Sequence, residues 1–281
     1  MPYEGYKCLR VEPERGVAFV TIDHPPLNLF DIALMAEVDR LGRELEGDEA
    51  VRVVVFQSAN PDFFIAHADV ELIRGLPRDA GPRPTELGFF HQAMERFRNM
   101  PKVTIGKIEG RARGGGSELL LALDLRFGAI GRCILAQPEV AIGIIPGGGG
   151  TQRLPPLVGR GRALEIVLGC ADFDAELAER YGWINRALPA ESLGAFVDAL
   201  AFRIASFSPE AVALAKGSVD AAELPTREGL LEEEHRFQRS LATEAAQERM
   251  AAFLAAGGQT RDIELNLGAL VSALADAPKD S

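Results

Sequence analysis

The residues best suited to chemistry are two glutamates, each close to a run of glycines. Glu118 follows Gly114–Gly116, and Glu139 precedes a longer run at Gly147–Gly150. Glycines leave backbone amides uncovered, and the first turn of a helix has N–H groups without intrahelical partners. Such a turn can bind an anion, or a carbonyl oxygen that becomes negative during a reaction. The two carboxylates therefore predict acid–base chemistry beside an oxyanion site.

Other functions of the glycine turns lack residues that they require. No Gly-Lys-Ser/Thr follows Gly147–Gly150, so a phosphate-binding loop would lack its lysine. Gly114–Gly116 does not form GxGxxG, and no acidic residue stands where a ribose-binding one would be needed. Ser117 lacks the second glycine of a nucleophile elbow and has no evident histidine partner, so we interpret it as structural.

Composition limits the classes of function. The 281 residues suffice for one large domain, or for a core with an appendage, and the net charge of −11 argues against nucleic-acid binding. Three scattered cysteines without CxxC indicate reduced thiols, and the four histidines show no metal-ligand spacing, so no metal is expected. No signal-peptide pattern and no long apolar run occur, which favours a cytoplasmic protein without membrane contact.

The elements that must position the glutamates alternate along the chain. We expect strands at 6–11, 16–22, Val51–Gln57, Val103–Ile108 and Asp124–Ile130. We expect helices after an Asp31 cap, from a Thr85 cap to Asn99, and at Glu118–Leu123, 160–169, 174–181, 191–206, 208–221, 226–256 and 260–276. The order predicts an α/β domain with a partly parallel sheet. Residues 75–86 are expected to form a loop, and the charged run Glu232–Arg236 to form a solvated helix face.

Four stretches, taken together and in order, resemble the enoyl-CoA hydratase/isomerase (crotonase) family. They are Ala66-His67-Ala68-Asp69, Gly114–Leu119, Gln137-Pro138-Glu139 and Ile145–Leu154. The resemblance extends from about residue 6 to about residue 255. It implies an α/β crotonase (ClpP-like) spiral of ββα units with a C-terminal helical trimerisation region. The implied division is a core at 1–205 and a helical region at 206–281, in a homotrimer or a dimer of trimers.

The resemblance also implies a site. The backbone amides of Ala68 and Gly115 would form an oxyanion hole for the thioester oxygen, and Glu118 and Glu139 would hold a water near a backbone group of Gly147. Coenzyme A would arrive as part of the acyl-CoA substrate, with no permanently bound cofactor. The residues implied in binding it are Leu27, Ala66, His67 and Asp69.

The implied activity is the addition of water to a trans-2-enoyl-CoA, which gives a 3-hydroxyacyl-CoA. Two alternatives keep the fold: a double-bond isomerase, which can work with a single carboxylate, and an acyl-CoA hydrolase. A third is a non-catalytic or RNA-binding homologue, against which the acidic charge and both glutamates argue.

The sequence departs from the family pattern near the site. His67 stands where the family usually has glycine; it is either a tolerated loop residue or a residue that reshapes the acyl pocket. Arg113 is expected either to face the pocket or to pair with Glu109. Residues 256–281 extend beyond the usual end of the family, and these departures concern the substrate more than the fold.

Overall fold

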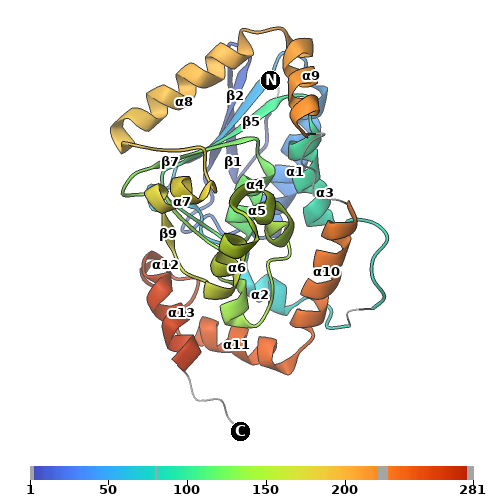
Figure 1. Ribbon diagram of the computed structural model, residues 1–281, viewed down its shortest axis with the longest axis vertical. Helices are drawn as coiled ribbons and strands as arrows, with labels where there is room; N and C mark the ends of the chain where they lie inside the picture. The colour runs from blue at the N-terminus through green and yellow to red at the C-terminus, as the bar shows by residue number, and fades with distance from the viewer. Residues whose placement is uncertain (1–2, 80, 221–226, 277–281) are drawn as a thin grey trace.

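Two sheets form the centre of the protein (Figure 1). The structure, a computed structural model, describes residues 3–79, 81–220 and 227–276. The six-stranded sheet has the order β1 (Leu9–Glu14), β2 (Val17–Ile22), β3 (Val53–Ser58), β5 (Val103–Ile108), β7 (Leu125–Ala129) and β10 (Arg186–Leu188). The four-stranded sheet has the order β4 (Phe63–Ile65), β6 (Arg111–Arg113), β8 (Ile134–Ala136) and β9 (Phe173–Asp174). Only the β1–β2 and β8–β9 pairs of the described strands are antiparallel.

From β3 to β8, successive strands alternate between the two sheets. β3, β5 and β7 enter the large sheet, and β4, β6 and β8, which follow them, enter the small one. Each strand pair leads to a helix, so the chain advances by strand, strand and helix. This arrangement confirms the predicted α/β spiral of ββα units.

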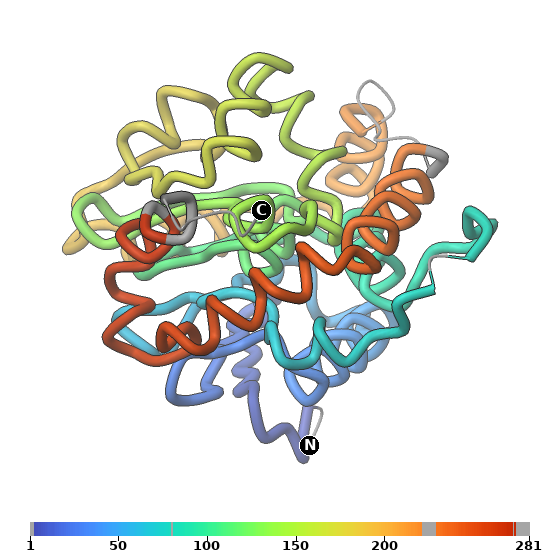
Figure 2. Tube along the Cα trace, turned by 90° about the horizontal axis from the view of Figure 1, so that it is seen from below, coloured from blue at the N-terminus to red at the C-terminus, as the bar shows by residue number. Residues whose placement is uncertain are grey.

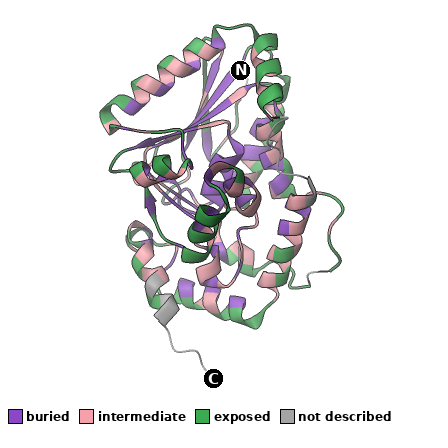
Figure 3. Ribbon diagram, viewed as in Figure 1, coloured by how far each residue is buried: buried purple, intermediate pink, exposed green. Residues whose placement is uncertain are grey.

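The helices are α1 (Ile32–Gly47), α2 (Val70–Arg74), α3 (Phe89–Asn99), α4 (Gly115–Ala122), the 3-10 helix η1 (Glu139–Ile142), α5 (Gly150–Val158), α6 (Arg160–Gly169), α7 (Ala175–Tyr181), α8 (Ala190–Ala205), α9 (Pro209–Asp220), α10 (Arg227–Leu241), α11 (Glu244–Ala255), α12 (Arg261–Leu265) and α13 (Leu267–Asp276). Helix α8 covers one face of the large sheet, and α1 and α3 cover the other (Figures 1 and 3). Alternate residues of β3 serve the two faces: Val53 and Val55 pack with α8, whereas Val54 and Phe56 join the core with α1. The predicted burial of this strand on both faces is confirmed.

Several predicted boundaries are wrong. Helix α3 begins at Phe89 with Gly88 as its N-cap, and Thr85 lies outside it. The expected helix at 226–256 is two helices, because the Thr243 side chain accepts a bond from an α11 amide and starts a new helix there. The expected helix at 260–276 is likewise divided into α12 and α13, whereas the Asp31 cap of α1 is confirmed.

The last four helices wrap one end of the molecule. Figure 2, which views this end, shows the orange-to-red segment α10–α13 crossing it from one side to the other. Helix α11 packs against α2 and η1, and α13 packs against η1. The division at residue 205 stays a prediction. Among the described residues, no helix is both long enough and apolar enough to cross a membrane.

Candidate active site

The predicted oxyanion amides lie side by side. Strand β6 ends in Gly114, whose φ of +48° favours glycine, and α4 begins at the next residue. A Cβ atom on Gly115 would lie 3.3 Å from the Ala68 Cβ and 3.6 Å from the Ala68 nitrogen. Among the described residues, neither of these two amides donates to a protein acceptor. Two free amides beside one another suit a single oxygen ligand.

Both amides open into a small cavity together with Glu139. A Cβ on Gly114 would approach Glu139 Oε1 to 2.9 Å, so only glycine leaves room for this carboxylate. The cavity measures about 40 Å³. That volume holds a few waters at most, whereas sites for drug-sized ligands measure at least about 300 Å³. Apolar side chains from the C-terminal helices close it, namely Phe253, Leu267 and Val271.

Glu118 is held by the second glycine run. It is buried in α4, and its Oε1 accepts bonds from the amides of Gly148 at 2.7 Å and Gly150 at 2.9 Å. The amides that bind Glu118 are thus those of Gly148 and Gly150. Burial and the nearby charge of Glu233 raise the pKa of Glu118 to about 7, against the opposing effect of the two amides.

Close packing fixes this turn. A Cβ on Gly148 would come within 2.3 Å of the Phe90 ring and 2.5 Å of Glu118 Oε2. Arg153 Nη1 donates to the Gly148 carbonyl at 3.0 Å and its Nη2 to Glu95 at 2.6 Å. Arg153 thus supports the glycine turn and ties it to α3.

Glu139 begins η1 and is also buried. With its amide nitrogen turned toward Glu139, Gln137 donates to both carboxylate oxygens, at 3.0 and 3.1 Å. Burial and the charge of Glu118 raise the pKa of Glu139 well above its usual range. Each of the two carboxyls therefore keeps a proton to a higher pH than an exposed glutamate does.

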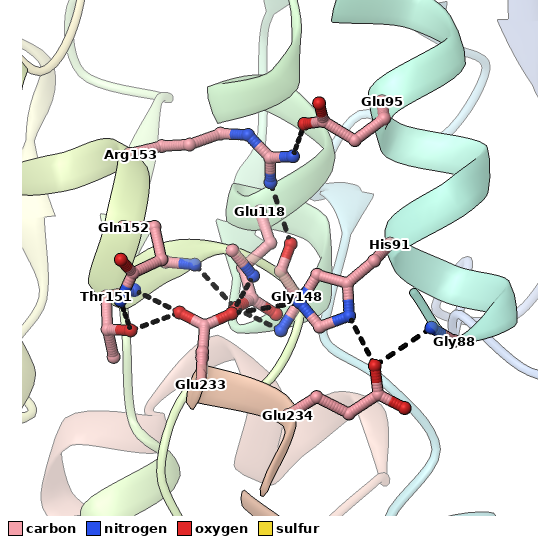
Figure 4. A network of polar contacts seen from close by, with 12 residues as sticks. Gly88, His91, Glu95, Glu118, Gly148, Thr151, Gln152, Arg153, Glu233 and Glu234 are labelled. Atoms are coloured by element: carbon pink, nitrogen blue, oxygen red, sulfur yellow. Dashed lines mark hydrogen bonds and ion pairs between the residues drawn. The ribbon is translucent and has the colours of Figure 1, made fainter. Parts of the chain in front are cut away.

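A third carboxylate, that of Glu233, lies close to Glu118, as Figure 4 shows. Glu233 of α10 is 1% exposed, so the expectation of a solvated face is wrong for this residue. It accepts bonds from the amides of Gly149 at 2.5 Å and Thr151 at 2.8 Å, and from the Thr151 hydroxyl. His91 Nε2 of α3 lies 3.1 Å from its Oε1.

A periodic signal for the burial of Glu233 was present in the sequence. Leu230, Phe237 and Leu241 mark an apolar stripe along α10 at intervals of seven and four residues. Positions 233 and 234 fall inside that stripe, three and four residues after Leu230. The stripe predicts an inward side chain at Glu233, and the surrounding charges conceal it.

His67 and Arg113 bind the C-terminal segment. His67 Nδ1 donates to the Ala68 carbonyl at 2.8 Å, and its Nε2 lies 3.0 Å from Glu264 of α12. Arg113 makes two 2.7 Å bonds to Asp172 and donates to the Glu264 carbonyl at 2.9 Å. The expectation that Arg113 faces the pocket or pairs with Glu109 is therefore wrong.

The segment after residue 256 also covers the residues implied in coenzyme A binding. Leu27 and Ala66 form a buried cluster against which Leu265 packs. The Asp69 side chain caps α2 and accepts a bond from Gln259 at 3.0 Å. The roles of Leu27, Ala66, His67 and Asp69 toward coenzyme A stay predictions, as does that of Gly147.

Comparisons with known proteins show the family of this chain. The family model described as "Enoyl-CoA hydratase/isomerase" matches residues 12–258. A "Probable enoyl-CoA hydratase" of Rhizobium meliloti is 36% identical over 89% of this chain and 96% of its own length. A "Short-chain-enoyl-CoA hydratase" of Clostridium acetobutylicum is 32% identical over 87% and 93%. A crystal structure of a Streptomyces avermitilis protein classed with the enoyl-CoA hydratases has a TM-score of 0.88 and 42% identity, over 96% of this chain and 99% of that one.

Proposed function

The chain belongs to the enoyl-CoA hydratase/isomerase family, and from this premise we propose that it adds water to a trans-2-enoyl-CoA to give a 3-hydroxyacyl-CoA. The observation that carries the proposal is the placement of two buried carboxyls with raised pKa values, one of which shares a cavity with two free amides. An acid and a base of this kind are what a hydration needs, since one proton leaves water and another reaches carbon.

Each group of the site takes one step of the proposed hydration. Glu118, ionised, takes a proton from water while the water oxygen bonds to C3 of the enoyl group. The electron pair of the double bond moves to the thioester oxygen, where the amides of Ala68 and Gly115 stabilise the enolate by about 3 kcal/mol each. Glu139 then gives its proton to C2, and the electron pair returns to form the C2–H bond. Proton exchange with solvent resets both carboxyls.

The acyl group that we propose is short. The cavity is small, and Phe253, Leu267 and Val271 of the C-terminal helices are part of its lining. A long acyl chain would have to displace the C-terminal helices, whereas a chain of a few carbons needs a smaller movement. The relative from Clostridium acetobutylicum carries the name of a short-chain hydratase, which supports this choice.

A substrate panel tests the activity. The purified protein is incubated with 2-enoyl-CoA esters from crotonyl-CoA to long-chain esters, and mass spectrometry reads the products. We expect a mass gain of one water, fastest with the shortest esters. An isomer or a free acid as the only product would assign the protein to the isomerases or the hydrolases. No product from any ester, with tight RNA binding instead, would favour the non-catalytic homologue.

We propose that the chain assembles as a trimer or a dimer of trimers through its exposed apolar helices. No residue of α9 is buried, and Leu214 and Val219 of this helix are 65% and 72% exposed. Leu168 of α6 is 62% exposed. Exposed apolar side chains gathered on helices favour association. Light scattering after size exclusion is expected to give three or six times the 30.3 kDa of one chain, and a monomer would contradict the proposal.

A further inference from the structure

We propose that Glu233 and His91 are positioning residues for Glu118, which fix the turn that binds its carboxylate and place one negative and one positive charge beside it. The inference rests on the proposed role of Glu118 as the base. It concerns residues of α3 and α10 that lie outside the cavity with Glu139. Their effect on the reaction would therefore pass through Glu118.

The turn gives its amides alternately to two carboxylates. Gly148 and Gly150 donate to Glu118, whereas Gly149 and Thr151 donate to Glu233. The two carboxylates thus bind successive amides of one short backbone segment, close to one another in Figure 4. Loss of either carboxylate would leave two of these four amides without an acceptor and let the turn rotate. Glu233 consequently sets the direction of the two amides that Glu118 receives.

His91 balances the charge of this arrangement. It is 2% exposed, and its two ring nitrogens lie 3.1 Å from Glu233 and 3.5 Å from Glu234. Burial disfavours the imidazolium, but the bonds to the two carboxylates outweigh it and raise the pKa of His91 to about 9. The histidine is therefore positively charged at neutral pH, with both nitrogens donating. A buried carboxylate at Glu233 is tolerated because this cation and three further donors face it.

The charges around Glu118 act in opposite directions on its proton. The charge of Glu233 raises the pKa of Glu118, and the charge of His91 lowers it. The titratable and charged groups packed around this centre come from four elements: Glu233 and Glu234 of α10, His91 and Glu95 of α3, Glu139 of η1 and Arg153 of α5. The opposing charges of Glu233 and His91 thus keep the pKa of Glu118 close to neutral pH, where a general base is most effective.

Two neutral variants distinguish this role from a scaffolding one. Glu233→Gln removes the negative charge, so the acid limb of kcat/KM is expected to move about one pH unit lower. His91→Gln removes the positive charge and keeps an amide donor for Glu233, so the limb is expected to move higher by a similar amount. A purely structural role would lower the rate in both variants and leave the limb in place. Glu232→Gln is the matched control on α10, because Glu232 pairs only with exposed arginines in the described structure.

The titration of Glu118 is also read without turnover. Carbon-13 NMR follows the glutamate carboxyls in a titration from about pH 5 to about pH 9 and gives the pKa of Glu118. Its signal is assigned as the one that is lost in Glu118→Gln. Opposite displacements in Glu233→Gln and His91→Gln support the inference, and displacements in one direction or none overturn it. Should the wild type hydrate no enoyl-CoA, the proposed function fails while this titration still decides the inference. If Glu233→Gln does not fold, two other variants decide the inference. Glu233→Asp keeps the charge and should keep the wild-type acid limb, and His91→Gln should still move it higher.

Discussion

Glu118→Gln is expected to lower the turnover of hydration by about 10²–10⁴, the contribution of a positioned general base. The variant should fold normally, because both amides donate to a single oxygen, Oε1, which glutamine can also supply. The change therefore removes the base and keeps the turn. Steady-state rates on the best ester of the panel measure the loss, and calorimetry with the saturated ester should show unchanged binding.

Glu139→Gln is expected to reduce turnover by a similar factor for a different reason. Its side chain can give no proton to C2, so the enolate has to wait for solvent. The two variants should also differ in their pH profiles: loss of Glu118 removes the acid limb, and loss of Glu139 removes the alkaline limb. Glu71→Gln, on the exposed face of α2, is the control and should keep full activity. Wild-type turnover in either glutamine variant would refute the assigned chemistry.

The parts of the site that the sequence predicted are those carried by contiguous motifs. Gly115 with Glu118, and Ala68 with its neighbours, each lie within a few residues of one another, so residue types and order were sufficient to propose them. The strands of the large sheet were predicted because they are five or six residues long, apart from β10. Strands of two or three residues, such as β4 and β9, are too short for a periodic signal.

What the sequence did not predict are pairings between distant residues. Glu233 meets Gly149 across 84 positions, and His67 meets Glu264 across 197. A charged run looks alike whether one member turns inward or all face solvent, and only the tertiary fold decides. His67 looked like an isolated departure because the carboxylate that explains it lies in α12, in the segment beyond the usual end of the family.

The burial of Glu264 predicts a large effect on stability. Its side chain is fully buried, and it accepts a bond from the Gln259 amide at 2.8 Å besides its contact with His67. Removal of one partner of a buried ion pair typically costs about 3 kcal/mol or more. Glu264→Gln is therefore expected to release α12 and α13 from the core. Amide hydrogen exchange should become faster at residues 259–271 and stay unchanged in the large sheet. Glu248→Gln, at an exposed position of α11, is the control.

The dependence of this pairing on pH follows from its two partners. Burial opposes the charge of His67, but the charge of Glu264 outweighs it, so the pKa of His67 lies above its usual value and that of Glu264 below its own. The contribution of the pair to stability is therefore complete between about pH 4.5 and about pH 6.5. It is lost in acid as pH falls through the lowered pKa of Glu264, and in alkali as pH rises through the raised pKa of His67.

The same release should change the choice of substrate. Leu267 and Val271 close the cavity only while α12 holds its place, so Glu264→Gln is expected to raise kcat/KM for longer 2-enoyl-CoA esters relative to crotonyl-CoA. His67→Gly removes the other partner and should broaden the preference in the same direction. Thermal unfolding and the ester panel, run on both variants, measure the two effects together. Unaltered chain-length preference despite faster exchange at residues 259–271 would show that α12 and α13 stabilise the fold without setting the size of the acyl site.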